Sequence, residues 1–202
     1  MNILLKDLIE PIGIRHLIES TGGPASYYNT PERIRGIQYV VQSAIKQYPN
    51  VAHTKVHVVP NLPNAFYNFD KGEILLGEVD PVGLAHEIEH ANNVKQTGLY
   101  NKVLKAAQGV ARLNNIAALP TILALRTFIH NKERRNDILN TLSALSAAAV
   151  APILVEEAQA SLRATKMSPD KTKAMKTLGP AFMAHMLSNI SPVLTYQTGK
   201  KL

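Results

Sequence analysis

The residues His86, Glu87 and His90, in the stretch AHEIEHANN, have types and a spacing that could bind one metal ion. Positions four apart lie on the same face of a helix, so both imidazoles could reach one cation while Glu87 projects close beside them. A shuffled chain of this composition would contain the His-Glu-x-x-His pattern only about 0.01 times. The alternative is an ordinary amphipathic helix that carries two polar imidazoles. The spacing favours a metal site.

A catalytic zinc site normally has three protein ligands and an open fourth position, so the two histidines need a partner. Cysteine is absent, and His, Asp or Glu must therefore supply it. Glu156 and Glu157 directly follow an uncharged run, residues 138–155, and a carboxylate there is a candidate ligand. A solvated helix end would explain the same pair. The residue types leave the choice between these two glutamates open.

Local patterns predict the elements that must position these side chains. The predicted strands are TKVHVV and EILLG, and PNLPNAFYNFDKG is an irregular link that includes extended segments. Thr30 caps a helix that runs to about Tyr48, and Asp80 caps the helix with the histidines. Residues 2–19 have a helical pattern interrupted by Pro11, and STGGPASYYNTP is a predicted loop. Further helices are expected at about 101–128, 138–166 and 171–189.

Length and composition fit one α+β, mostly helical domain over residues 1–202, with a small β-sheet, then the histidine helix, then a helical C-terminal half. The formal charge of +7 is spread over the chain and forms no specific nucleic-acid motif. The start, MNILLKDLIEP, has acidic residues within its apolar stretch and does not resemble a signal peptide. We therefore expect an intracellular protein.

The stretch VHVVPNLPNAFYNFDKGEILLGEVDPVGLAHEIEHA resembles the core of the HtpX-type and CAAX-prenyl-protease metallopeptidases, in which an Asn-Ala-Phe segment and a short strand precede the His-Glu-x-x-His helix. Here Asn64, Ala65 and Phe66 fill that segment. The downstream EAQASLRA is similar to the Glu-x-x-Ala-Ser pattern of bacterial putative neutral zinc metallopeptidases. The resemblance covers about residues 55–165 and implies a zincin-like fold with Glu157 as third ligand and Glu156 as runner-up.

The resemblance further implies a gluzincin-like metalloendopeptidase with one Zn²⁺ ion, in which Glu87 is the general base of peptide-bond hydrolysis. Tyr196, in SPVLTYQ, resembles a Leu-Thr-Tyr segment near the end of the neutral metallopeptidases and is a candidate oxyanion donor, with His185 as an alternative. The strand EILLG, with Ile74 and Leu75, is expected to line the cleft beside Asn64 and Ala65 and to pair with an extended peptide substrate.

Two departures from the family pattern affect this site. Glu89 stands where family members often have a small residue, which changes the packing around the helix. Ser161 replaces the Asp of the HtpX type, so the hydrogen bond that orients a histidine ligand is expected to be weaker or to come from elsewhere.

Two other classes of function compete with the peptidase. One is a catalytically silent metallopeptidase-like protein with a structural or interaction role. The other is a basic helical protein that binds anionic lipid or nucleic acid. Residues 138–155 reach the length of a marginal membrane span, and a transmembrane hairpin is one alternative. Their Asn, Thr, Ser and Ala content favours the other, a hairpin packed against protein, with peripheral membrane contact and purification without detergent.

Overall fold

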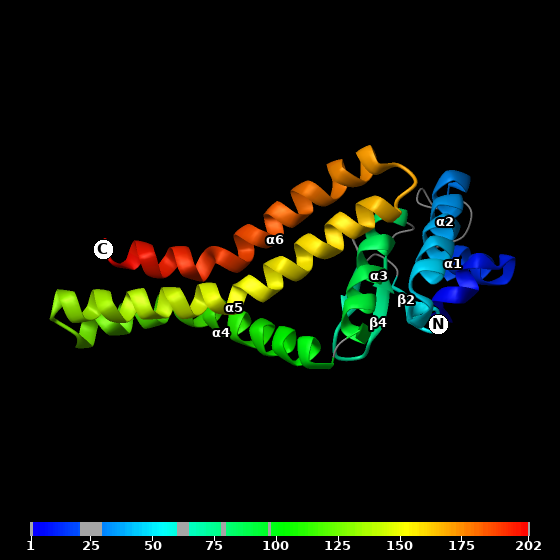
Figure 1. Ribbon diagram of the computed structural model, residues 1–202. Coiled ribbons are helices and arrows are strands. Elements are labelled where there is room, and N and C mark those ends of the chain that lie inside the picture. Colours follow the sequence, from blue (N-terminus) through cyan, green and yellow to red (C-terminus); the bar gives the residue numbers. More distant parts are fainter. Residues whose placement is uncertain (1, 21–29, 60–64, 78–79, 97, 202) are drawn as a thin grey trace. The chain divides into compact units, whose positions relative to one another are not determined.

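The computed structural model describes residues 2–20, 30–59, 65–77, 80–96 and 98–201 (Figure 1). Within these residues it is α+β and mostly helical, as the sequence predicts. The chain divides into two compact units where the sequence predicts one domain. The sheet unit comprises Met1–Gly98 and Gln159–Gly179, and the helical unit comprises Leu99–Ala158 and Pro180–Leu202. The division crosses two helices, each of which contributes to both units.

The sheet unit contains a four-stranded mixed sheet in the order β1-β2-β4-β3. Its strands are β1 (Asn2–Leu4), β2 (Lys55–Val58), β3 (Ala65–Asn68) and β4 (Glu73–Leu76). Strand β4 pairs in parallel with β2 and antiparallel with β3, so both of its edges are occupied. Strand β3 is therefore an edge strand of this sheet.

The predicted strands β2 and β4 are confirmed, and the irregular link contains β3. The helical pattern of residues 2–19 is correct only for its second part, α1 (Pro11–Ser20), because β1 and a 3₁₀ helix (Leu5–Ile9) precede it. Strand β1 exists through its antiparallel pairing with β2, an interaction between distant residues that local periodicity does not encode. Most of the predicted loop after α1, residues 21–29, lies outside the described residues.

Two capped helices pack together in the sheet unit, α2 (Pro31–Gln47) and α3 (Pro81–Gln96). The Thr30 hydroxyl accepts a hydrogen bond from the backbone N–H of Arg33, and the Asp80 carboxylate accepts one from Gly83, as expected of N-caps. Helix α3 also contacts β3 and β4. The core between these elements is apolar and fully buried, and its larger members include Leu5, Leu8, Leu17, Ile37, Ile74, Leu76, Leu84 and Ile88.

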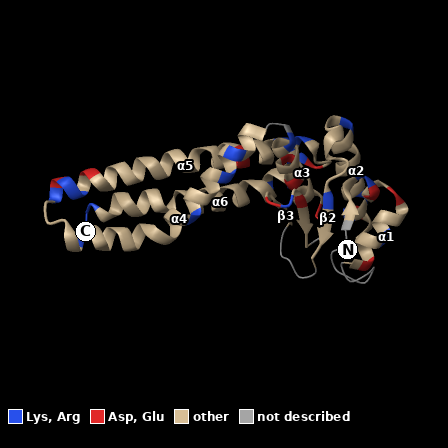
Figure 2. Ribbon diagram, turned by 90° about the horizontal axis from the view of Figure 1, so that it is seen from below, with Lys and Arg blue, Asp and Glu red and all other residues tan. Residues whose placement is uncertain are grey.

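The helical unit is built from long helices, α4 (Gly98–Phe128), α5 (Lys132–Met167) and α6 (Lys171–Gly199), of which α6 is ten residues longer than predicted. Figure 2 shows Lys, Arg, Asp and Glu residues gathered where α5 begins, followed by a long stretch of the helix without them. Pro120, Pro152, Pro180 and Pro192 lie inside these helices. Each removes a backbone donor and favours a local bend.

The close approach of α2 to the first turn of α3 depends on Gly36. A Cβ atom there would lie 2.5 Å from Cγ of Pro81. We predict that Gly36→Ala lowers the free energy of unfolding by about 1–3 kcal/mol through overpacking, measured by urea titration followed by circular dichroism. Gly109→Ala is the control, because nothing lies within 4 Å of a Cβ there, and it should stabilise α4 by about 0.5–1 kcal/mol. Equal effects of the two changes would contradict the predicted clash.

Candidate metal centre

His86 and His90 face one another on α3, one helical turn apart. Their Nε2 atoms lie 3.0 Å apart, and the rings meet edge to face with centroids 4.5 Å apart. Two nitrogens bound to one tetrahedral zinc ion at ordinary bond lengths would lie about 3.3 Å apart. The two imidazoles are therefore already close to the spacing that a shared cation requires.

The third member of the group is Glu157 on α5. One ligand atom from each of His86, His90 and Glu157 lies within 4.8 Å of the others. Two imidazoles and one carboxylate are a ligand set of catalytic zinc sites, and they leave a fourth position open. The residues present thus fit a bound divalent cation. Among the described residues, the structure brings the three predicted ligands together in the predicted register.

The turn of α5 that follows Glu157 lies against α3. Ser161, one turn after Glu157, has its hydroxyl 3.5 Å from Nδ1 of His86, which is the ring nitrogen away from His90. This distance is at the outer limit of a hydrogen bond, in keeping with the expected weakening where Ser replaces Asp. On the other side, the ring of Phe69 packs edge to face on His90, with centroids 5.8 Å apart. Both imidazoles therefore have neighbours that restrict their rotation.

Glu89 is buried on α3 and does not face solvent. Arg163 of α5 places its Nη1 3.8 Å from the Glu89 carboxylate and donates a 2.8 Å hydrogen bond to the side-chain oxygen of Asn93. Burial raises the pKa of Glu89, and the nearby Arg163 guanidinium acts against that rise. Glu89 is thus part of the contact that holds α5 against α3. Arg163 and Asn93 were missed from sequence, because nothing local links positions 70 residues apart.

His185 of α6 lies beside the candidate ligand Glu157 in the helical unit. Its Nε2 is 3.6 Å from Oε1 of Glu157, and its side chain is 43% exposed. Tyr196 lies eleven residues further along α6, about 16 Å at the rise of an α-helix. The Tyr196 side chain is buried with Ala118, Ile122 and Leu139. Of the two candidate oxyanion donors, His185 is therefore the one beside a candidate ligand.

The other glutamates of the candidate site are buried. Glu87, the predicted base, is 6% exposed, and Glu156, the runner-up ligand, is 1% exposed. Glu156 is not in the group of three whose ligand atoms converge. Glu156 is therefore not a solvated residue at a helix end. The carboxylate that lies close to His86 and His90 is that of Glu157.

The predicted substrate-binding residues are placed differently from expectation. Ile74 is fully buried in the sheet unit, and Leu75 is half-buried. Both belong to β4, whose backbone is already paired with β2 and β3, so β4 has no free edge for a peptide. The expectation that EILLG pairs with substrate is thus corrected. Ala65 lies on the edge strand β3, and Asn64 lies outside the described residues.

Comparison of the chain with protein-family models, with curated proteins and with solved structures found no match.

The contact of Arg163 with α3 predicts an effect on metal binding at a distance from the ligands. Arg163→Met should lower zinc affinity about 10–100-fold, as expected when a supporting residue is lost, because α5 no longer holds Glu157 in register. Competition with a chromophoric chelator would measure the affinity. Lys166→Met, an exposed change on the same helix, is the control and should leave it unchanged. Equal affinities in the two variants would show that the Arg163 contact does not support the ligands.

Proposed function

We propose that this protein is a zinc-dependent metalloendopeptidase. The observation that carries the proposal is the convergence of His86, His90 and Glu157 within 4.8 Å, with Glu87 next to the first ligand on the same helix. When bound, the ion would supply a Lewis acid for a peptide carbonyl and for water. The three side chains would hold it at one point while leaving a coordination position open.

Glu87 supplies the proton transfer in this proposal. Its carboxylate takes a proton from the attacking water and passes it to the nitrogen of the departing amine. The low exposure of Glu87 removes competing bulk water from the carboxylate. His185, beside Glu157, is the group that we assign to the oxyanion as a hydrogen-bond donor in place of the buried Tyr196.

The metal-ligand assignment predicts a pattern of zinc loss. His86→Ala, His90→Ala and Glu157→Ala should each lower the bound zinc well below one ion per chain, because each removes one of three ligands. Glu156→Gln is the matched control, since it keeps the shape of a buried neighbour and should retain zinc. Elemental analysis of purified chains measures the stoichiometry and identifies the metal. If all three alanine variants kept their zinc, the proposed metal site would be excluded. If only the Glu156→Gln control lost zinc, the third ligand would be Glu156 and not Glu157.

The assignment of Glu87 as base and not ligand predicts a separation of binding from catalysis. Glu87→Gln should keep stoichiometric zinc and lose about 100- to 10,000-fold in the rate of peptide hydrolysis. His185→Ala should also keep zinc and lower kcat more than it raises KM. Cleavage of a broad peptide library, before and after chelation, provides the assay. A zinc-loaded wild-type chain that cleaves none of these peptides would favour the structural or interaction role.

In the part of the chain that the structure describes, no strand pairs with the outer edge of β3, and this edge predicts where an extended peptide would bind. Strand β3 contacts α3, Ala65 packs near Gly83 at the start of that helix, and Phe66 is 43% exposed. A peptide that adds a strand there would gain main-chain hydrogen bonds. Phe66→Pro removes one backbone donor and should raise KM while zinc stays bound. Phe66→Ala, which keeps the backbone, is the control. An unchanged KM in Phe66→Pro would exclude this edge from the peptide site.

A further inference from the structure

The helical unit buries some polar side chains together with its small apolar cluster, and it exposes many large apolar side chains. Its buried serines, Ser143 at 3% and Ser146 at 1% exposure, lie on the inner face of α5. Large apolar side chains of the same unit are exposed, among them Leu113, Ile116, Leu119 and Leu123 on α4, Leu145 and Val155 on α5, and Leu187 and Leu194 on α6. The sheet unit, by contrast, has an ordinary apolar interior.

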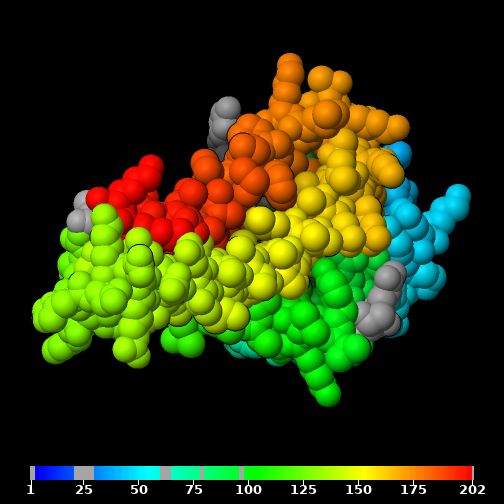
Figure 3. Space-filling model, turned by 60° about the vertical axis from the view of Figure 1, so that its left-hand side comes forward, coloured from blue at the N-terminus to red at the C-terminus, as the bar shows by residue number. Residues whose placement is uncertain are grey.

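The buried polar groups hold the three helices to one another. Asn114 of α4 donates a 3.0 Å hydrogen bond to the Ser146 hydroxyl, and Gln197 of α6 donates a 2.8 Å bond to Ser143. The Ser143 hydroxyl itself donates to the carbonyl of Val193 at 3.4 Å. Figure 3 shows α5 and α6 running side by side on one face of this unit. Small and polar residues between helices are typical of bundles surrounded by lipid, where apolar contacts give helices no preference for one another.

The exposed surface is a layer without formal charge. Helix α5 contains an 18-residue window of mean hydropathy 1.9, and only 28% of that window is buried. The uncharged run of residues 138–155 would extend about 27 Å, close to the hydrocarbon thickness of a bilayer at ~30 Å. The core helix of a soluble protein would be mostly buried. Ser143 and Ser146, two of the polar residues that favoured a hairpin packed against protein, are buried between the helices, whereas Leu145 and Val155 of the same helix are exposed.

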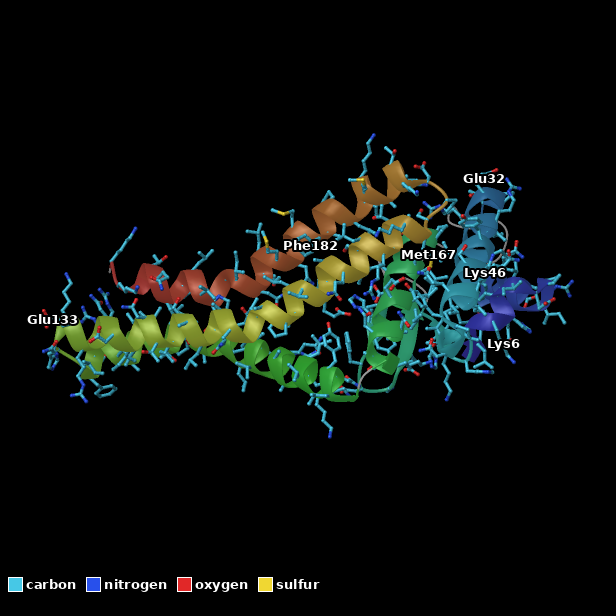
Figure 4. The ribbon with its side chains drawn as sticks, in the orientation of Figure 1. Lys6, Glu32, Lys46, Glu133, Met167 and Phe182 are labelled. Carbon is cyan, nitrogen blue, oxygen red and sulfur yellow. The ribbon has the colours of Figure 1, made fainter. Side chains whose placement is uncertain are left out.

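Charged side chains border this layer at both ends. One end has Arg126, Lys132, Glu133, Arg134, Arg135, Asp137, Lys200 and Lys201, and Figure 4 places Glu133 where α5 begins. The other end has Arg112, Glu156 and Glu157. The uncharged segments of α4 and α6, residues 113–125 and 186–199, lie between the same borders. They are shorter than that of α5, but arginine and lysine side chains at such borders can extend to the headgroups.

We propose that the helical unit is inserted in the hydrocarbon layer of a lipid bilayer, with α5 crossing it. Exposed leucines and isoleucines then lie against acyl chains. Between the helices, Asn114 pairs with Ser146 and Gln197 pairs with Ser143. An apolar groove of about 340 Å³ on this surface, lined in part by Leu119, Leu123 and Leu194, is open to an acyl chain. This proposal does not depend on metal binding or peptidase activity.

The chain contains no tryptophan, so a single introduced tryptophan reports on one site. Leu145 is 60% exposed and lies near the middle of the uncharged run of α5, so Leu145→Trp is the first probe. Leu187→Trp, at an exposed position on α6, is the second probe. The full chain is reconstituted in phosphatidylcholine and phosphatidylglycerol vesicles that contain lipids brominated in the acyl chain. Both probes should show blue-shifted emission and lose most of it by quenching. Tyr39→Trp, 50% exposed on α2, is the control and should not be quenched.

Three results would overturn the proposal. The first is that neither probe is quenched by brominated lipid. The second is release of the chain from vesicles by high salt or carbonate, which would indicate peripheral binding through charge. The third is that the chain stays monodisperse without detergent or lipid, and that the Leu145→Trp emission is blue-shifted only at protein concentrations where dimers form. This result would assign the exposed face to contact with a second copy of the chain. Retention in carbonate-washed membranes together with quenching of either probe supports the proposal.

Discussion

The candidate site depends on the contact between α3 and α5. Two of its side chains are fixed by the helical repeat alone, since His86 and His90 are one turn apart. The third comes from a helix that begins more than forty residues later, and it is useful only if α5 meets α3 in one register. Ser161 near His86, together with Arg163 near Glu89 and Asn93, fixes that register within one turn of α5. Glu157 lies one turn before Ser161 and is positioned by the same contacts.

This dependence explains which parts were predictable from sequence. The caps at Thr30 and Asp80, the strands β2 and β4 and the spacing of the two histidines are local, and each is encoded within a few residues. The choice of Glu157 over Glu156 came from a resemblance and not from geometry. The sequence could identify Glu89 as unusual but not its partner, because an ion pair between distant residues has no local signature.

Strand order and the facing of side chains were not predictable from the sequence, and the reason is the same for both. EILLG was correctly predicted as a strand, but a strand pattern does not say whether the strand is at the edge or the centre of a sheet. Likewise, the uncharged run of α5 contains serines and alanines whose number suggested contact with protein. Their placement, with Ser143 and Ser146 inside and Leu145 outside, depends on the contacts of α5 with α4 and α6. The amino-acid composition of a helix does not tell which of its residues face the neighbouring helices and which face outward.

The continuity of α5 limits how this chain can be divided or recombined. A boundary drawn by compactness passes between Ala158 and Gln159, one residue after Glu157 and within one unbroken helix. A shortened chain that ends at that boundary would keep Glu157 but lose Ser161 and Arg163, which contact α3. A chimera that exchanges the helical unit for another would lose the Glu157 carboxylate itself. The proposed metal site therefore does not allow the two units to be exchanged as independent modules. Variation of the apolar segment that keeps this site must preserve the helical phase that carries Glu157 to α3.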